Sequence, residues 1–408
     1  MRILLVNHYA GSPQHGMEYR AHHLAREWVR AGHMVQIVAA SFSHVRSVQP
    51  QVFRDPLDES IDGIAYRWIP TPRYAGNGLG RVRNIATFLW RLWRQADHWA
   101  DAFRPDAVIA SSTYPMDIWV ARRIARRAGA KLVHEVHDLW PTSPVELSGM
   151  SVRHPFIVLC QKAEDDACRD ADIVVSMLPK VASHLQAHGL DLRKLHLVPN
   201  GISPEEWVAA PVPVDAKLAG HLRAQRAAGR VVVVYAGSHG APNALDVLLD
   251  AAKALADEPF AFVLVGDGHE KARLAQRVRS EAIGNVEMFA PIPKAQIPAL
   301  LAGADIAYIG WKRQPLYRFG IAPNKLMDYM MAGVPVLHSV EAGNDPVAEA
   351  GCGLTVAPES PAAVAEGLRR LAALPVAERR GMGERGRAFV LAHHSYPVLA
   401  QRFIEAIA

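Results

Sequence analysis

The chain alternates short, β-branched hydrophobic runs with longer segments whose hydrophobic positions recur every three to four residues. The short runs of the first half predict strands over 3–6, 35–39, 107–110, 131–136, 173–177 and 195–198. Those of the second half predict strands over 231–235, 261–265, 286–289, 306–309, 334–338 and 354–356. Segments such as 18–31, 215–228, 244–255 and 396–408 have the spacing of helices. This alternation predicts βαβ units and parallel sheets.

Two such series are joined by an irregular stretch that contains Pro204, Pro211 and Pro213. The sequence therefore predicts an α/β protein of two Rossmann-like, doubly wound domains that face a central cleft. Their expected bounds are 1–202 and 203–395, and a last helix over 396–408 could pack on either domain. In open parallel sheets, ligands bind beyond the carboxyl ends of the strands.

Composition narrows the class of protein. Of 408 residues, 50% are hydrophobic and 21% are charged, which excludes a disordered or fibrous chain. The three cysteines lack the spacing of a disulfide framework or a zinc site. No apolar run reaches the roughly 18–20 residues of a membrane span, and the short apolar run at 3–6 leads us to expect no signal peptide. We expect a cytoplasmic protein.

The formal net charge of +5 is confined to the first half, where 24 Lys and Arg face 19 Asp and Glu. Segment 81–127 holds nine Arg against four Asp, and its part 81–94 is a helical stretch rich in Trp, Leu and Arg. Such a helix can contact an anionic membrane surface. The alternative is a core-packing helix with a solvated Arg face. Nucleic acid is not an expected partner, because no binding module is visible and the charge is modest.

The segment 317–335 is the richest in candidate chemistry. Gly320 and Pro323 predict a turn, and a helix is expected from Asn324 to about 333. The first amides of a helix have no intrahelical partner and carry the positive end of its dipole. With Lys325 and Arg318 beside them, they would suit a diphosphate. The alternative is a capped helix with a solvated Lys.

Three further features accompany that helix start. Asp328 lies one turn into the helix, where its carboxylate could accept hydrogen bonds from a ribose diol. Gly237 and Ser238 follow one predicted strand, and Gly266 and Asp267 follow the next. Glycines at these turns allow close approach of backbone amides to phosphate. No GxGxxG motif follows these two strands, which argues against a dinucleotide-binding protein.

Other candidates follow neighbouring strands. Ala290 comes after the strand over 286–289 and could give backbone contacts to a base. His137 and Asp138 come directly after the strand over 131–136, although Asp138 could simply cap the next turn. Gly16 closes a glycine-containing loop after the first strand.

The ordered set of motifs resembles family-four retaining glycosyltransferases of the GT-B fold. In the second half these motifs are AGSHG, LVGDGHEK, FAPIPK, FGIAPNKLMDYMMAGVPV and DPVAEAGCGLTV. In the first half they are AREWVRAGHMV, VHEVHDLWP and LVPNGI. GNGLGRVRN and HDLWP resemble the subgroup that builds bacterial surface polysaccharides.

The resemblance implies a donor domain in the second half and an acceptor domain in the first. It implies that Asp328 binds the donor ribose, that His137 faces the donor sugar or the reacting centre, and that Gly16 lies near the transferred sugar. The chain departs from the family at Gly320, where a glutamate is usual. It also lacks the usual Arg and Lys after the strand over 231–235, so we expect Lys325, helped by Arg318, to replace them.

The expected reaction is transfer of a sugar from a nucleoside-diphosphate sugar, UDP-sugar favoured, to a hydroxyl of a glycan or lipid-linked acceptor. The resemblance implies that no metal is bound, and we expect no cofactor; helix amides and Lys325 would then stabilise the leaving group. Asp165 and Asp166 are assigned to a charged helix. Two other functions stay open, a nucleotide-sugar 2-epimerase and a catalytically degenerate nucleotide-sugar-binding subunit.

Overall fold

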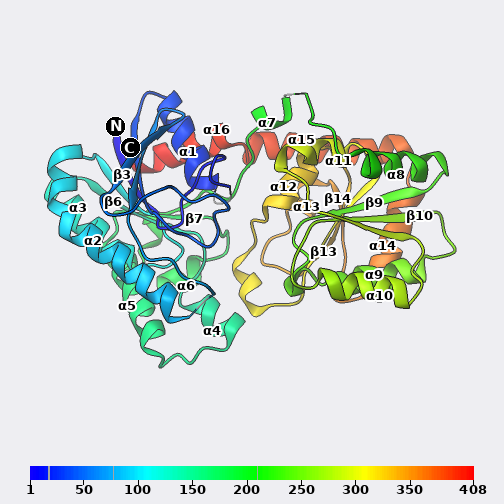
Figure 1. Ribbon diagram of the computed structural model, residues 1–408, viewed down its shortest axis with the longest axis horizontal. Helices are drawn as coiled ribbons and strands as arrows, with labels where there is room; N and C mark the ends of the chain where they lie inside the picture. Colours follow the sequence, from blue (N-terminus) through cyan, green and yellow to red (C-terminus); the bar gives the residue numbers. More distant parts are fainter. Residues whose placement is uncertain (17–18, 77, 209) are drawn as a thin grey trace. The chain divides into compact units, whose positions relative to one another are not determined.

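The computed structural model describes residues 1–16, 19–76, 78–208 and 210–408, and Glu18, expected to begin a helix, lies outside them. The chain forms two compact units (Figure 1). The first consists of Met1–Asn200 together with Tyr396–Ala408, and the second of Gly201–Ser395. The last helix, α16 (Tyr396–Ile407), thus belongs to the first unit.

The first unit contains an eight-stranded sheet. Its order is β3-β4-β2-β1-β5-β6-β7-β8, and all neighbouring pairs except β3 and β4 are parallel. Its strands are β1 (Arg2–Val6), β2 (Met34–Ala40), β3 (Leu57–Ile61), β4 (Ile64–Ile69), β5 (Ala107–Ala110), β6 (Lys131–Val136), β7 (Ile173–Ser176) and β8 (Leu195–Leu197). Besides α16, its helices are α1 (Tyr19–Arg30), α2 (Leu79–Phe103), α3 (Asp117–Ala128), α4 (Thr142–Ser148), α5 (Pro155–Asp170), α6 (Ala182–Ala187) and the short 3₁₀ helix η1 (Leu192–Lys194).

The second unit contains a six-stranded, fully parallel sheet with the order β11-β10-β9-β12-β13-β14. Its strands are β9 (Val231–Ala236), β10 (Phe260–Val265), β11 (Val286–Phe289), β12 (Ile306–Gly310), β13 (Val336–Ser339) and β14 (Gly353–Thr355). Its helices are α7 (Glu205–Val208), α8 (Ala216–Ala227), η2 (Ala241–Asn243), α9 (Leu245–Ala254), α10 (Lys271–Ser280), η3 (Lys294–Gln296), α11 (Ile297–Leu301), η4 (Pro315–Phe319), α12 (Asn324–Met331), α13 (Pro346–Ala350), α14 (Pro361–Ala373) and α15 (Val376–His393). This strand order is that of the Rossmann fold.

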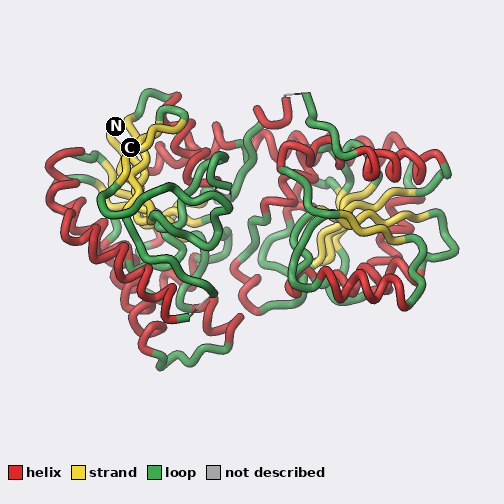
Figure 2. The backbone as a smooth tube through the Cα atoms, in the orientation of Figure 1, coloured by secondary structure: helices red, strands yellow, loops and turns green. Residues whose placement is uncertain are grey.

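Helices cover both faces of each sheet (Figure 2). Successive strand residues point to opposite faces, so Val232 and Val234 of β9 pack with α8, α12 and α15, whereas Val233 and Tyr235 pack with α9, α10 and α14. In the first unit, one face packs against α1 and α16 and the other against α2, α3 and α5. Burial on both faces explains why the strands read as continuous hydrophobic runs. The prediction of two doubly wound α/β domains is confirmed.

The sequence analysis missed the hairpin of β3 and β4. β3 has the sequence LDESI, and four of its five residues lie at least partly exposed on the sheet edge, so it has no hydrophobic run to detect. The sequence does contain a hairpin signal, the pair Asp62-Gly63 between the two strands. In the structure these residues have φ values of 52° and 78°. An Asp-Gly pair with positive φ at both positions is typical of a two-residue hairpin turn.

Candidate functional site

In the second unit, the candidate site lies where the strand order reverses. β9 is flanked by β10 on one side and by β12 on the other, and open α/β sheets bind ligands at the carboxyl ends of such strands. The Tyr329 hydroxyl, on α12, accepts a hydrogen bond of 2.9 Å from the Ala236 amide and donates one of 3.2 Å to the Ala236 carbonyl. The end of β9 is therefore fixed to α12.

The glycines after β9 and β10 are required by the packing of their two loops. A Cβ added at Gly266 would lie 1.8 Å from the carbonyl oxygen of Gly237, and one at Gly268 would lie 2.6 Å from the backbone of His239. The His239 amide donates to the Asp267 carbonyl at 2.7 Å. Loop packing therefore explains these glycines without a ligand, and their role toward phosphate stays a prediction.

Lys325 extends from the first turn of α12 to this glycine loop. Its ammonium group lies 2.9 Å from the Tyr235 hydroxyl and 2.7 Å from Oδ1 of Asn243. It also lies 3.0 Å from where a Cβ at Gly237 would stand. Burial lowers the pKa of Lys325 to about 8. Within the described parts of the chain, no carboxylate pairs with this ammonium group, so it can accept an anion.

The helix that carries Lys325 begins where the sequence predicted. α12 starts at Asn324, directly after Pro323, whose φ of −75° and ψ of 125° are extended. No side chain caps this end of the helix. Its first amides therefore add partial positive charge near Lys325.

Asp328 lies one turn further along α12 and is buried. Its carboxylate forms an ion pair with Lys294, the first residue of η3. Burial raises the pKa of Asp328, although Lys294 acts in the opposite direction. The sequence analysis did not identify Lys294, and the role of Asp328 toward a ribose stays a prediction.

The other residues predicted on this edge are more exposed or serve the loops. The Ser238 carbonyl accepts a hydrogen bond of 2.6 Å from the Tyr235 hydroxyl. Asp267 is exposed, and its carboxylate accepts from the Gly268 amide at 2.8 Å. Ala290 is exposed directly after β11.

Arg318 is exposed on η4, where its guanidinium lies 4.2 Å from the Phe319 ring and donates to the Pro315 carbonyl at 2.7 Å. Two of its contacts are thus within its own turn. Asn344 accepts from the Ile321 amide at 2.7 Å and so holds the segment just before Pro323.

In the first unit, the strand order reverses between β1 and β5, and polar side chains gather at the ends of β1, β5 and β6. Asn7 donates to the Ser111 hydroxyl at 3.2 Å, and Ser111 donates to the carboxylate of Glu135 at 2.6 Å. Nε2 of His137 lies 3.0 Å from the Ser111 hydroxyl and 3.2 Å from the Glu135 carboxylate. The ring of His137 is thereby oriented by two groups.

Glu135 is fully buried and paired with Arg20 of α1. Nε of Arg20 lies 2.9 Å from Oε1 of Glu135, and its Nη1 and Nη2 donate to the carbonyls of Pro199 and Val198 at 2.5 and 2.7 Å. Burial alone would raise the pKa of Glu135, but Arg20 and His137 outweigh it and hold the pKa well below its usual range. The carboxylate is therefore ionised.

Asp138 and Gly16 have structural contacts of their own. The carboxylate of Asp138 accepts from the Leu139 amide at 2.8 Å and from the Ser143 hydroxyl at 2.5 Å, so it caps the turn into α4. Gly16 has φ of 66°, and a Cβ there would lie 2.2 Å from the Ser47 hydroxyl.

One group of side chains in the described residues could hold a metal ion, formed by Glu164, His184 and His188. It was not anticipated from the sequence. No helix in the described residues combines the length and hydrophobicity that a membrane crossing requires.

Two family models match the chain. Residues 15–201 match the glycosyl transferase 4-like domain, and residues 230–373 match the glycosyl transferases group 1. Their order is that of the two α/β units. The chain belongs to the glycosyl transferases of the GT-B fold.

Individual relatives agree with this assignment. The putative colanic acid biosynthesis glycosyl transferase WcaI of Escherichia coli K12 is 30% identical over 148 residues, and that alignment covers 35% of this chain and 36% of WcaI. The chain thus spans about a third of the length of this curated relative. Among solved structures that share the fold, sucrose-phosphate synthase from Thermosynechococcus elongatus has a TM-score of 0.72 at 19% identity over 99% of this chain and 97% of that one. HepE from Anabaena, in complex with UDP and glucose, has a TM-score of 0.66 at 16% identity over 99% and 98%.

The buried pair behind His137 predicts a large loss of stability in this glycosyl transferase. Glu135→Gln leaves Arg20 buried without its anion, which should cost about 3–5 kcal/mol of unfolding free energy. Because the pKa of Glu135 is lowered, its contribution is present above the ordinary glutamate pKa of about 4.3 and is lost as pH falls below it. Urea unfolding at pH 7 and pH 2.5, followed through hydrogen exchange of the β6 amides, measures both effects.

The control for this prediction is Asp101→Asn, which removes the partner of Arg127 at the surface. It should leave stability unchanged. Equal stability of the Glu135→Gln protein and the wild type would contradict the buried charge pair.

Proposed function

We propose that the chain is a retaining glycosyltransferase that uses a nucleoside-diphosphate sugar, with UDP favoured, and transfers the sugar to a hydroxyl of a glycan or lipid-linked acceptor. The second unit is the donor domain and the first the acceptor domain. The role in surface polysaccharide synthesis rests on the sequence motifs and on the name of the WcaI relative.

The observation that carries this proposal is the environment of Lys325. Its partly buried ammonium group lies beside the loop after β9 and contacts only neutral groups among those described, Tyr235 and Asn243. A diphosphate would supply the missing negative charge and would also meet the first amides of α12. The Anabaena relative with this fold binds UDP and glucose, which favours the same class of donor here.

The other candidate residues, apart from the turn-capping Asp138, have roles in this scheme. Asp328 accepts hydrogen bonds from the ribose diol and shares its carboxylate with Lys294. Gly237, Ser238, Gly266, Asp267, Ala290, Arg318, Pro323 and Asn324 line the donor side, and Gly16 serves the transferred sugar. His137 acts at the reacting centre, with Glu135 as the residue that positions it.

The transfer itself needs no metal and no protein nucleophile. As the bond between the anomeric carbon and the phosphate oxygen breaks, Lys325 and the α12 amides stabilise the developing phosphate charge. The departing phosphate accepts the proton of the acceptor hydroxyl, which attacks from the same face and so retains the configuration.

A turnover assay tests the function. With a panel of UDP-, GDP- and ADP-sugars, we expect release of the nucleoside diphosphate that depends on an added lipid-linked or glycan acceptor, and weaker binding of 2′-deoxy-UDP than of UDP. Release without acceptor together with a free epimerised sugar would establish the 2-epimerase instead. Binding of a donor without turnover would establish a degenerate binding subunit.

The pKa of Lys325 predicts a pH dependence of UDP binding. At a pKa of about 8, the ammonium form falls from roughly nine-tenths at pH 7 to one-tenth at pH 9, so affinity should fall about tenfold. Lys325→Met should weaken binding about 10- to 100-fold at pH 7, through loss of a charge-assisted contact, and abolish this pH dependence. Isothermal titration calorimetry measures both.

The matched control is Lys253→Met, a partly exposed lysine on α9 that pairs with Glu281. It should leave UDP affinity and its pH dependence unchanged. A Lys325→Met protein that binds UDP as the wild type does would remove Lys325 from the site.

We further propose that α2 contacts an anionic membrane surface, on the cytoplasmic side, where a lipid-linked acceptor would be found. Its buried face holds Ile85, Phe88 and Leu92, while Trp90 and Trp93 are 56% and 44% exposed. The guanidinium groups of Arg94 and Arg123 lie over these two indoles at 5.1 and 4.8 Å. Exposed indoles next to arginines suit the membrane interface.

Vesicle co-sedimentation tests this contact. Trp90→Glu/Trp93→Glu should lose most of its binding to phosphatidylglycerol vesicles, because two carboxylates replace the indoles, and Val376→Glu, at an exposed residue of α15, should not. The proposal would be contradicted if the wild-type protein did not bind anionic vesicles, or if both variants bound them equally.

A further inference from the structure

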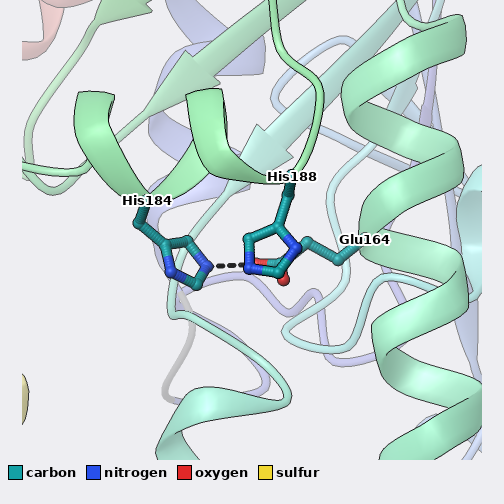
Figure 3. A group of neighbouring side chains, drawn as sticks. All are labelled: Glu164, His184 and His188. Atoms are coloured by element: carbon teal, nitrogen blue, oxygen red, sulfur yellow. Dashed lines mark hydrogen bonds and ion pairs between the residues drawn. The ribbon is translucent and has the colours of Figure 1, made fainter.

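Two histidines and a glutamate come together on the helices that flank β7. Glu164 lies on α5, His184 lies on α6, and His188 directly follows the end of α6. The spacing of four residues places both histidine rings on one side of the α6 turn, with ring centroids 4.6 Å apart. Figure 3 shows the two rings and the carboxylate turned toward one another.

Their ligand atoms are close to the spacing of a metal site. The three atoms all lie within 4.8 Å of one another, and Nε2 of His184 lies 3.0 Å from Oε1 of Glu164. Zinc bonds of about 2.0–2.1 Å in a tetrahedron place ligand atoms roughly 3.3 Å apart. Small side-chain movements would therefore suffice to surround an ion.

The chemistry of the set selects the class of metal. Two imidazole nitrogens and one carboxylate oxygen are a set that holds zinc with a fourth position open, whereas magnesium and calcium prefer oxygen ligands alone. We propose that Glu164, His184 and His188 bind a divalent transition metal of the zinc class. The site is separate from the donor site of the proposed function and does not depend on it.

Neighbouring side chains form an outer shell for the three ligands. Oδ1 of Asp165 lies 2.9 Å from Nδ1 of His188. Nε2 of Gln161 donates to Oε2 of Glu164 at 3.0 Å and to Oδ1 of Asp165 at 2.9 Å. Hydrogen-bonded carboxylates and amides beside the ligands are what orients them in metal sites.

The group is buried on one side and accessible on the other. The Glu164 side chain is only 4% exposed, whereas those of His184 and His188 are 13% and 27% exposed. Gln161 and Asp165 also line a groove of about 560 Å³ along α4 and α5. The partly exposed imidazoles of His184 and His188 leave an ion access to the site.

The position of Glu164 suggests what the metal does. Glu164 also lines a small cavity with Glu135 and His137. A metal that ties α6 to α5 would hold Glu164 in place next to the strand end that carries His137. Its role is to fix the structure of this edge, and transfer of the sugar proceeds without it.

Zinc titration of the full chain tests the site. After removal of metals with EDTA, we expect one equivalent of Zn²⁺ to bind and to raise the melting temperature, and Co²⁺ to give the intense visible absorption of a four-coordinate ion. Loss of an outer-shell partner typically costs 10- to 100-fold in metal affinity, so His184→Gln/His188→Gln should lose more than about 100-fold.

The control variant is His98→Gln/His269→Gln, which changes two exposed histidines elsewhere in the chain. It should bind Zn²⁺ as the wild type does. Circular dichroism in EDTA verifies that each variant is folded, and the single variant His188→Gln, at the more exposed ligand, replaces the double variant should that one not fold. Absence of Zn²⁺ binding by the wild type, or equal binding by the ligand and control variants, overturns the proposal.

Discussion

The parallel direction of the strands is the constraint on which both candidate sites depend. It brings the carboxyl ends of the parallel strands in a sheet to one edge, so residues distant in sequence meet there. In the second unit this edge joins the loops after β9 and β10 to the start of α12. In the first it joins Ser111, Glu135 and His137, from or just after β5 and β6.

The charged side chains at the two sheet edges differ in whether they have a counter-ion. Arg20 neutralises the charge of Glu135. It also donates to the carbonyls of Val198 and Pro199, so the pair links the end of β6 to the segment directly after β8. Lys325 has only neutral partners among the described residues, and burial lowers its pKa accordingly. A charged side chain that is paired with an opposite charge contributes to the structure. A charged side chain without such a partner is available to bind a ligand of opposite charge.

Much of the fold could be predicted from the sequence, because strands buried on both faces are continuous hydrophobic runs. The start of α12 was also predicted, since Pro323 and the helical spacing after it are local signals. The ion-pair partners of Asp328 and Glu135 were not predicted. Lys294 lies 34 residues from Asp328 in the sequence, and Arg20 lies 115 residues from Glu135. Local sequence patterns do not reveal pairs so far apart. A glutamate within the hydrophobic run 131–136 does indicate that a buried partner is required. His184 and His188 were missed for the same reason, because Glu164 joins them only through the packing of α5 and α6.

The glycines after β10 have a structural cause that the sequence does not reveal. Gly266 and Gly268 follow the carboxyl end of β10, and their positions are fixed by contact with the loop after β9. The proposed affinity for an anion therefore rests on Lys325 and the first amides of α12 rather than on the glycines alone.

The most direct test of this account is a crystal structure of the protein with UDP. The account predicts the diphosphate at the start of α12, with a phosphate oxygen within hydrogen-bonding distance of Nζ of Lys325 and the ribose hydroxyls at Asp328. A diphosphate bound elsewhere, with Lys325 still held only by Tyr235 and Asn243, would contradict it.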